Sequence, residues 1–175
     1  MRAIKGSLRL SGFTLIELLV VLTIAAIIVF QIAPSFAELI QAARINTAVS
    51  QMERSLRFAR STALLRKAPV RLCPSEDGNL CSASGDWSKG WITFVDQYGG
   101  STRDPEDEVV ATQASFRSIQ LYFNRGSLLS LNALGRVTQS GTMRICDPRQ
   151  PHNSVALVII HSARLRREIG MGSCS

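Results

Sequence analysis

One carboxylate lies where its surroundings are least able to solvate it. Between Phe13 and Ala37 the only charged residue is Glu17, and the rest of this stretch is almost entirely apolar. A carboxylate inside an apolar, membrane-entering segment costs about 3 kcal/mol, so such residues are usually functional and have a partner. We therefore expect Glu17 to take part in a specific charge interaction.

Four cysteines form the second group of reactive side chains: Cys73, Cys81, Cys146 and Cys174. Zinc sites use closely spaced pairs such as Cys-x2-Cys, and the sequence contains no such spacing. An even number of cysteines beyond a membrane segment favours disulfides formed in an oxidising compartment. Of the three pairings available, Cys73–Cys81 with Cys146–Cys174 closes the shortest loops and is the one we expect.

The other residues that could do chemistry form no catalytic or metal-binding pattern. The sequence has no nucleophile–base pair or phosphate-binding loop, and neither His152 nor His161 belongs to a metal-binding or catalytic motif. The acidic stretch Asp104–Glu108 lacks the spacing and the glycine of an EF-hand, so we expect a solvated loop there. The sequence therefore predicts a protein that is not an enzyme and has no catalytic residues, no metal and no cofactor.

The elements that position these residues begin with a short basic stretch, residues 1–12, followed by the apolar run Leu15–Ala33. That run is close to the roughly 20 residues that span a bilayer. An ordinary secretory signal ends in a small-x-small cleavage site after its apolar run, and residues 35–37 are a poor candidate for one because of Pro34, Phe36 and Glu38. An uncleaved signal anchor is the simpler alternative, but it leaves Glu17 unexplained.

The local string Ser11–Glu17 closely resembles the prepilin signal of type IV pilins and of the pseudopilins of type II secretion. The resemblance implies that prepilin peptidase removes the leader, residues 1–12, by cutting between Gly12 and Phe13. Phe13 is then N-methylated, and Glu17, the fifth residue of the mature chain, neutralises the amino terminus of a neighbouring subunit. Pro34 stands where these proteins carry a proline that relaxes the helix, and residues 13–37 form the membrane-spanning or filament-core segment.

Loss of the leader changes the charge balance. The whole chain has 20 basic and 13 acidic residues, a net charge of +7, and removal of Arg2, Lys5 and Arg9 leaves 17 basic residues and a net charge of +4. This modest excess permits contact with nucleic acid or anionic surfaces, and it is equally typical of ordinary solvated faces.

Residues 38–68 are expected to form the amphipathic second half of the helix, ending before Pro69. The apolar stripe consists of Ile45, Val49, Met52, Leu56, Ala59 and Ala63. The opposite face is basic and contains Arg44, Arg54, Arg57, Arg60, Arg66 and Lys67. That face is either a solvated surface, whose arginine stems cover apolar neighbours, or a contact with an acidic subunit or a polyanion.

Residues 69–175 are expected to form a β-rich globular head. Eight short candidate strands are punctuated by glycine and asparagine: Val70–Cys73, Trp91–Val95, Val109–Thr112, Ile119–Phe123, Leu128–Leu131, Thr142–Cys146, Val155–His161 and Arg164–Ile169. Short connections favour antiparallel pairing. The fold class predicted is α+β and pilin-like, with a long N-terminal helix packed on a C-terminal antiparallel sheet.

A narrower resemblance runs through the head. It is carried by Phe58–Ser61, Pro69–Cys73, Trp87, Gly90–Asp96, Val155–Ile160 and Ala163–Arg166. These segments resemble the GspH/FimT family, which contains the H-type minor pseudopilins of type II secretion and the FimT/FimU minor pilins.

That resemblance implies a minor type IV pilin, inserted in the bacterial inner membrane with a periplasmic head and then incorporated into the pilus or its initiation or tip complex. Its partners would be other major and minor pilins, prepilin peptidase and the membrane. The alternative is an H-type minor pseudopilin of a type II secretion system.

The C-terminal run also resembles the Gly-Arg-x-Arg ending of FimT/FimU members, some of which bind DNA in competent bacteria. The resemblance makes Arg164 and Arg166, with Arg167 as a local addition, candidate DNA-binding residues. Ala163 replaces the glycine of that ending, so a tight turn is less favoured there. Alternation along a strand would put Arg167 on the opposite face. The alternative interpretation is an edge strand protected from aggregation by its charge.

Overall fold

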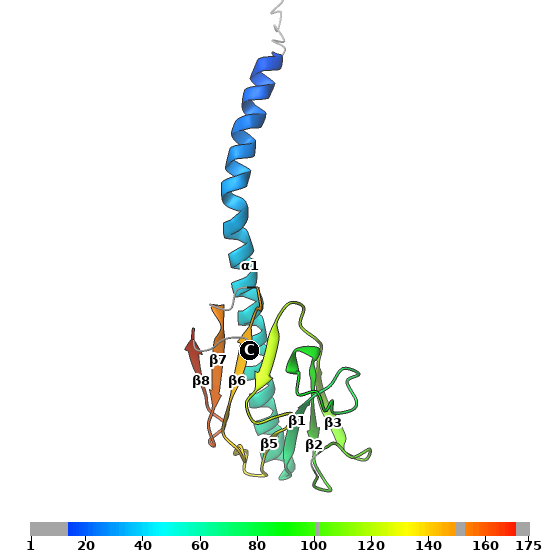
Figure 1. Ribbon diagram of the computed structural model, residues 1–175. Coiled ribbons are helices and arrows are strands. Elements are labelled where there is room, and N and C mark those ends of the chain that lie inside the picture. The colour runs from blue at the N-terminus through cyan, green and yellow to red at the C-terminus, as the bar shows by residue number, and fades with distance from the viewer. Residues whose placement is uncertain (1–13, 101, 150–152, 171–175) are drawn as a thin grey trace, which may run out of the picture. The chain divides into compact units, whose positions relative to one another are not determined.

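The computed structural model describes residues 14–100, 102–149 and 153–170, apart from the side chains of residues 32–35 (Figure 1). The chain divides into two compact units, Met1–Ile40 and Gln41–Ser175. Helix α1 (Leu15–Arg66) begins in the first unit and ends in the second. We describe each unit separately.

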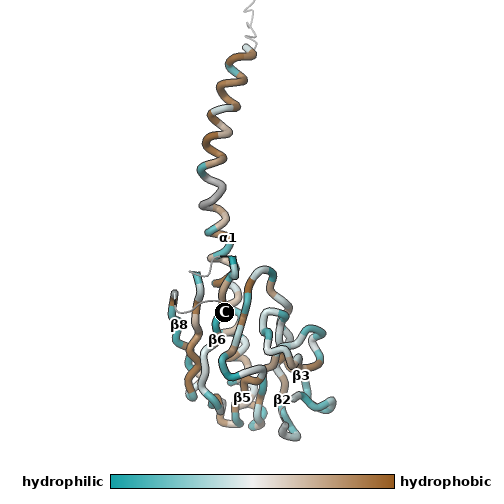
Figure 2. The backbone as a smooth tube through the Cα atoms, in the orientation of Figure 1, coloured by the Kyte–Doolittle hydropathy of each residue, from teal (hydrophilic) through white to brown (hydrophobic). Residues whose placement is uncertain are grey.

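The first unit is the apolar part of α1. Thr14 begins the helix, since its hydroxyl oxygen accepts a hydrogen bond from the backbone N–H of Glu17 at 3.3 Å and its carbonyl oxygen accepts one from Leu18 at 3.1 Å. Among the described residues, α1 is the one helix with the length and apolar composition to cross a membrane, and its apolar character dominates this unit in Figure 2. The backbone is helical through Pro34, and a kink there stays a prediction.

The second unit begins with the amphipathic part of α1. All six residues of the expected apolar stripe are buried, as are Ala48 and Thr62. The helix ends at Arg66, and Lys67 then adopts the left-handed conformation, with a φ of 52°, that commonly ends helices. Pro69, which lacks a backbone N–H, follows as expected.

Two four-stranded antiparallel sheets complete the second unit. The first has the order β3-β2-β1-β5 and consists of β1 (Val70–Pro74), β2 (Trp91–Val95), β3 (Glu108–Gln113) and β5 (Leu129–Leu131). The second has the order β4-β6-β7-β8 and consists of β4 (Gln120–Phe123), β6 (Gly141–Cys146), β7 (Val155–Ile159) and β8 (Leu165–Ile169). A short 3-10 helix, η1 (Trp87–Lys89), precedes β2.

The chain crosses between the sheets three times, because β4 pairs in the second sheet, β5 returns to the first and β6 pairs in the second again. One main core joins both sheets to α1, and the two tryptophans lie in it: Trp87 and Trp91 are 0% and 1% exposed. The indole N–H of Trp91 donates to the hydroxyl of Ser55 on α1 at 3.0 Å. A smaller cluster of Cys73, Ile92 and Phe94 covers the other face of the first sheet. The α+β, pilin-like fold class is confirmed.

Candidate functional site

The N-terminal end of α1 brings Glu17 into the first helical turn. A carboxylate at this position interacts favourably with the positive end of the helix dipole, whereas an ammonium group there is disfavoured. A new amino terminus at Phe13, one residue before the capping Thr14, would therefore need a compensating carboxylate. Gly12 and Phe13 lie outside the described residues, so the cleavage site and the N-methylation stay predictions.

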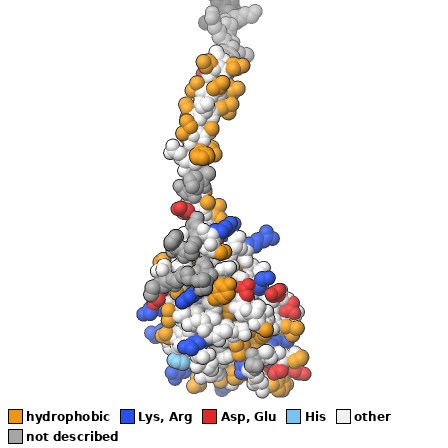
Figure 3. Space-filling model, viewed as in Figure 1, with side chains coloured by type: hydrophobic (Ala, Val, Ile, Leu, Met, Phe, Trp, Pro, Cys, Tyr) orange, Lys and Arg blue, Asp and Glu red, His pale blue; other side chains and the backbone are white. Residues whose placement is uncertain are grey.

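The surface of the first unit is unusual for a protein in water. Its large apolar side chains from Leu15 to Ile40 are exposed wherever they are described, with Leu15 at 82% and Phe30 at 86% (Figure 3). Contiguous apolar surface of this extent indicates a membrane or protein interface. The arrangement is suited to insertion in a bilayer or to packing against similar helices.

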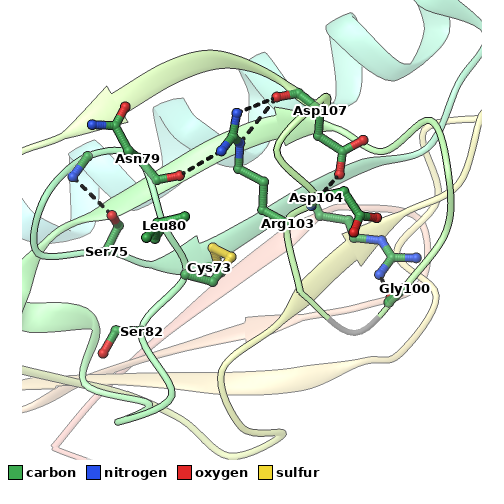
Figure 4. Close-up of a disulfide and its surroundings, with 12 residues drawn as sticks. Cys73, Ser75, Asn79, Leu80, Ser82, Gly100, Arg103, Asp104 and Asp107 are labelled. Atoms are coloured by element: carbon green, nitrogen blue, oxygen red, sulfur yellow. Dashed lines mark hydrogen bonds between the residues drawn. A yellow bond between two sulfur atoms is a disulfide. The ribbon is translucent and has the colours of Figure 1, made fainter.

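The expected disulfide between Cys73 and Cys81 is confirmed, with its Cα atoms 5.5 Å apart. It closes a loop that leaves β1 and runs through Ser75, Asn79 and Leu80 (Figure 4). The Asp77 carboxylate accepts hydrogen bonds from the backbone N–H groups of Leu80 and Asn79, and these lower its pKa. Cys146 is buried and is not a free thiol. Its expected partner, Cys174, lies outside the described residues, so that pairing stays a prediction.

As expected, most of the acidic stretch between β2 and β3 is exposed, but Asp107 is buried. Asp107 is only 1% exposed, and its carboxylate accepts hydrogen bonds from the backbone N–H groups of Gln97 (2.9 Å) and Asp104 (3.0 Å). Arg103 donates to the carbonyl oxygens of Asp107 and of Asn79, which joins this loop to the disulfide loop (Figure 4). The acidic composition predicts the exposure of Glu106 and Glu108, and it gives no sign that Asp107 is buried.

A second charge pair fixes the base of the same loop. Arg71 on β1 forms an ion pair with Asp96 at 2.6 Å, and their side chains are 16% and 3% exposed. Arg71 also donates to the carbonyl oxygen of Gly100, and the Asp96 carboxylate accepts from the backbone N–H of Gly99. Sequence analysis missed this pair because the partners are close only after β1 and β2 have paired.

The three candidate DNA-binding arginines follow a tight turn between β7 and β8. The N–H of Ala163 donates to Ile160 at 2.9 Å, and the N–H of Ile160 donates to Arg164 at 3.2 Å. Ala163 has a φ of 55°, so the turn forms in the absence of the expected glycine. Alanine tolerates this conformation at a cost of about 1 kcal/mol.

The three side chains have different surroundings. Arg164 is exposed just before β8, Arg166 forms an ion pair with Glu168 at 2.5 Å, and Arg167 donates to Asn46 on α1. Arg166 and Arg167 thus lie on opposite faces of β8, as strand alternation predicts. β8 is an edge strand of its sheet, which agrees with the alternative interpretation of a charged, protected edge.

The basic face of α1 is also partly engaged within the head. Arg57 lies 3.8 Å from Glu53, Arg66 forms a 3.2 Å ion pair with Glu108 on β3, and Arg60 donates to the carbonyl oxygen of Ser162. These side chains are exposed, so each ion pair contributes at most about 1 kcal/mol. The contacts favour a solvated face that also positions the turn before β8.

Two further observations bear on metal and charge chemistry. Across residues 14–100, 102–149 and 153–170 there is no group of three His, Cys, Asp or Glu side chains that could hold a metal ion. His161 lies in the turn between β7 and β8, where its Nδ1 is 3.0 Å from the carbonyl oxygen of Val137. Asp147 is buried, and the hydrogen bond from Arg149 lowers its pKa.

Comparisons with known proteins agree with this architecture. Residues 48–163 match the family model described as type II transport protein GspH, and residues 9–30 match the prokaryotic N-terminal methylation motif. No curated protein sequence matches the chain.

Three solved structures share the fold. The type IV minor pilin FimU of Pseudomonas aeruginosa gives a TM-score of 0.59 at 19% identity, covering 75% of this chain and 95% of FimU. A second crystal form of FimU gives 0.56 at 18% identity, covering 74% and 99%. The minor pseudopilin EpsH of the Vibrio cholerae type 2 secretion system gives 0.51 at 13% identity, again covering 74% and 99%. At these identities the likeness establishes the fold alone.

Proposed function

This chain belongs to the GspH family of minor pilins and pseudopilins, which assemble with other pilins into filaments, and on that premise we propose that it is a minor type IV pilin of the FimT/FimU kind. It would enter the pilus or its initiation or tip complex. The observation that carries this proposal is an exposed apolar helix that starts at Thr14, directly after an N-methylation motif, with Glu17 in its first turn. Members of this family are structural proteins.

The proposed mechanism is assembly. Prepilin peptidase cuts after Gly12, and the inner membrane holds the processed chain with its head in the periplasm. In the filament, Glu17 of one subunit neutralises the N-methylated Phe13 of its neighbour. The attraction between the two charges is stronger in a low dielectric, and an unpaired carboxylate there is costly. Neighbouring subunits therefore prefer the helix register that places Glu17 beside the amino terminus.

The alternative is an H-type minor pseudopilin of a type II secretion system. The pilus assignment is supported by the resemblance of residues 163–166 to the FimT/FimU ending, and a tight turn forms at Ala163 without the glycine of that ending. The test is deletion and complementation of the gene in the bacterium that encodes it. Loss of sheared surface pili with normal protein secretion supports a minor pilin, and the reverse result supports a pseudopilin.

DNA uptake is a second candidate function, supported by the exposed Arg164 at the β7–β8 turn and by the exposed Arg166, which would have to exchange its ion pair with Glu168 for a phosphate. Arg167 supports it less, because its side chain is engaged with Asn46 on the other face of β8. Two phosphate contacts would give weak binding whose logarithmic salt slope is about −2.

The test is DNA binding by the full chain in detergent at two salt concentrations. Arg164→Ala and Arg166→Ala should each weaken binding for all sequences and reduce the salt slope by about 1. Arg117→Ala is the control, because this exposed arginine precedes β4 at the end of the sheet opposite the β7–β8 turn. Unchanged binding in both variants removes the idea.

A further inference from the structure

The two sheets of the head have four outer edges, and two of them are covered by the chain itself. Beside β5, Leu131 forms a bridge with Val137, and Thr138 donates its N–H to Ser130 at 2.9 Å. Beside β4, Tyr122 forms a bridge with Asp86. Within the described part of the chain, β3 and β8 have no such cover on their outer sides.

A groove of about 370 Å³ with a mixed polar and apolar lining lies between α1 and β3. Its floor and walls come from α1, through Phe58, Thr62 and Leu65, and from β3, through Val109 and Val110. Phe58 is 43% exposed and Leu65 is 83% exposed, so the groove holds apolar surface that nothing in the described head covers. An open sheet edge beside apolar pockets is the arrangement that accepts an added strand.

The mouth of this groove is acidic on the sheet side. Glu108 lines it and is half exposed, as is its ion-pair partner Arg66. Glu106, exposed, and Asp104 precede Glu108 in the same loop. A strand that adds here is therefore favoured if it carries a positive charge opposite Glu108 and an apolar side chain that enters the groove.

The other open edge has those two features. β8 carries Arg166 and Arg167, and it ends in Ile169, whose side chain is 76% exposed. The side chains of Leu165, Arg167 and Ile169, every second residue, share one face of β8. On that face Leu165 packs against the main core. A β8 strand added beside β3 would present Arg167 and Ile169 on the helix side of the sheet, where Glu108 and the groove lie.

We propose that the β8 edge of one copy of this chain docks on the β3 edge of a second copy, with Ile169 in the groove between Phe58 and Leu65 and Arg167 beside Glu108. Because the two edges differ, the contact is heterologous: each head keeps one edge free for a further subunit. Backbone hydrogen bonds would supply most of the contact, and the charges would select the partner edge.

Cysteine cross-linking of the full chain in lipid vesicles tests the proposal, because no described cysteine is a free thiol and the new thiols are distinguishable. Leu65→Cys and Ile169→Cys replace exposed side chains, so both variants should fold. A heterologous contact predicts several-fold more cross-linked dimer in a mixture of the two variants than in either alone. The matched control replaces Leu65→Cys with Tyr122→Cys, an exposed residue on the covered β4 edge.

Charge reversal is the second test of the proposal. Glu108→Arg in the Leu65→Cys chain should reduce the mixed cross-link at least about tenfold, and Arg167→Glu in the Ile169→Cys chain should restore it. Arg66→Gln frees Glu108 from its internal partner and should not lower the mixed cross-link, which separates the contact between copies from the internal Arg66–Glu108 pair. The proposal is overturned if the mixture cross-links no more than the Tyr122 control, or if the double reversal restores nothing.

Discussion

At the β7–β8 turn, Ala163 occupies a backbone conformation that usually selects glycine. Its φ of 55° brings Cβ too close to the carbonyl oxygen, a strain of about 1 kcal/mol that glycine avoids. Ala163→Gly should therefore raise the free energy of unfolding by about 0.5 to 1 kcal/mol and the Tm by a few degrees. Part of the gain is lost because the Ala163 methyl group packs against the core.

Thermal unfolding followed by circular dichroism measures this change. Gly135→Ala is the matched opposite, since Gly135 has a φ of 66° and an added Cβ would lie 2.9 Å from Cγ of Arg60. That variant should lower the Tm. An Ala163→Gly protein less stable than the parent would show that methyl packing outweighs the backbone strain.

The buried Asp147 makes the stability of the head depend on pH. The hydrogen bond from the Arg149 side chain is the main cause that holds the pKa of Asp147 below its usual value, and the backbone N–H of Arg149 adds to it. A carboxyl group with a lowered folded-state pKa stabilises the fold above its unfolded pKa, and this stabilisation is lost as the pH falls through the folded pKa.

Arg149→Gln should therefore raise the pKa of Asp147 and move acid unfolding to higher pH. Urea unfolding between pH 2 and pH 7 measures the shift. Arg136→Gln, another exposed arginine, serves as the control because its side chain has no ion pair among the described residues. Coincident pH profiles for Arg149→Gln and the parent would contradict the assignment.

Among the elements, the disulfide loop shows how a short connection is stabilised. Cys73 lies at the end of β1 inside the small cluster with Ile92 and Phe94, and its bond to Cys81 ties the loop to that strand. For a loop with a sequence separation of 8, the chain-entropy model gives about 2.5 kcal/mol of stabilisation. Alanine at both positions should lower the stability by about that amount.

Differential scanning calorimetry of the Cys73→Ala/Cys81→Ala variant measures the loss. Ala83→Ser changes an exposed position just after this loop and should leave the Tm unchanged. If the double variant matches the parent, the network of Asn79, Arg103 and Asp107 holds the loop without the disulfide.

Sequence periodicity predicted the helix and the strands, but it did not predict how the strands pair into sheets. The stripe from Ile45 to Ala63 is apolar every three or four residues because one side of α1 is buried, so a local pattern reports it. The strands were predictable for the same reason. Their division into two sheets was not, because the return of β5 beside β1 depends on pairing between residues far apart in the chain.

The loops were the least predictable part, for a related reason. Asp107 and Asp96 are as polar as any solvated residue, and only the tertiary contacts of Arg103 and Arg71 show that they are buried. The candidate site at the N-terminus differed in this respect. Glu17 was found from sequence because a charge in an apolar run violates a local rule, and functional residues are often the ones that do so.

At the scale of the whole molecule, the protein combines an apolar helix that needs a covering environment with a head that folds around its own core. The membrane can cover the helix of a single subunit, and neighbouring helices can cover it in a filament. When a subunit moves from the membrane into a filament, protein replaces lipid around Glu17. A positive charge of the protein must then pair with the carboxylate.

Glu17→Gln tests that requirement. A neutral side chain lowers the cost of membrane insertion by up to about 3 kcal/mol, so the variant should accumulate normally in the membrane. In the filament it would leave the proposed amino terminus at Phe13 uncompensated in a low dielectric, so we expect incorporation to fall at least tenfold. Immunoblots of membrane and sheared-filament fractions measure the two steps separately. Glu38→Gln, an exposed acid beyond the apolar run, should behave as the parent does. Equal incorporation of Glu17→Gln and the parent would show that the register is set by helix packing, with no contribution from this charge.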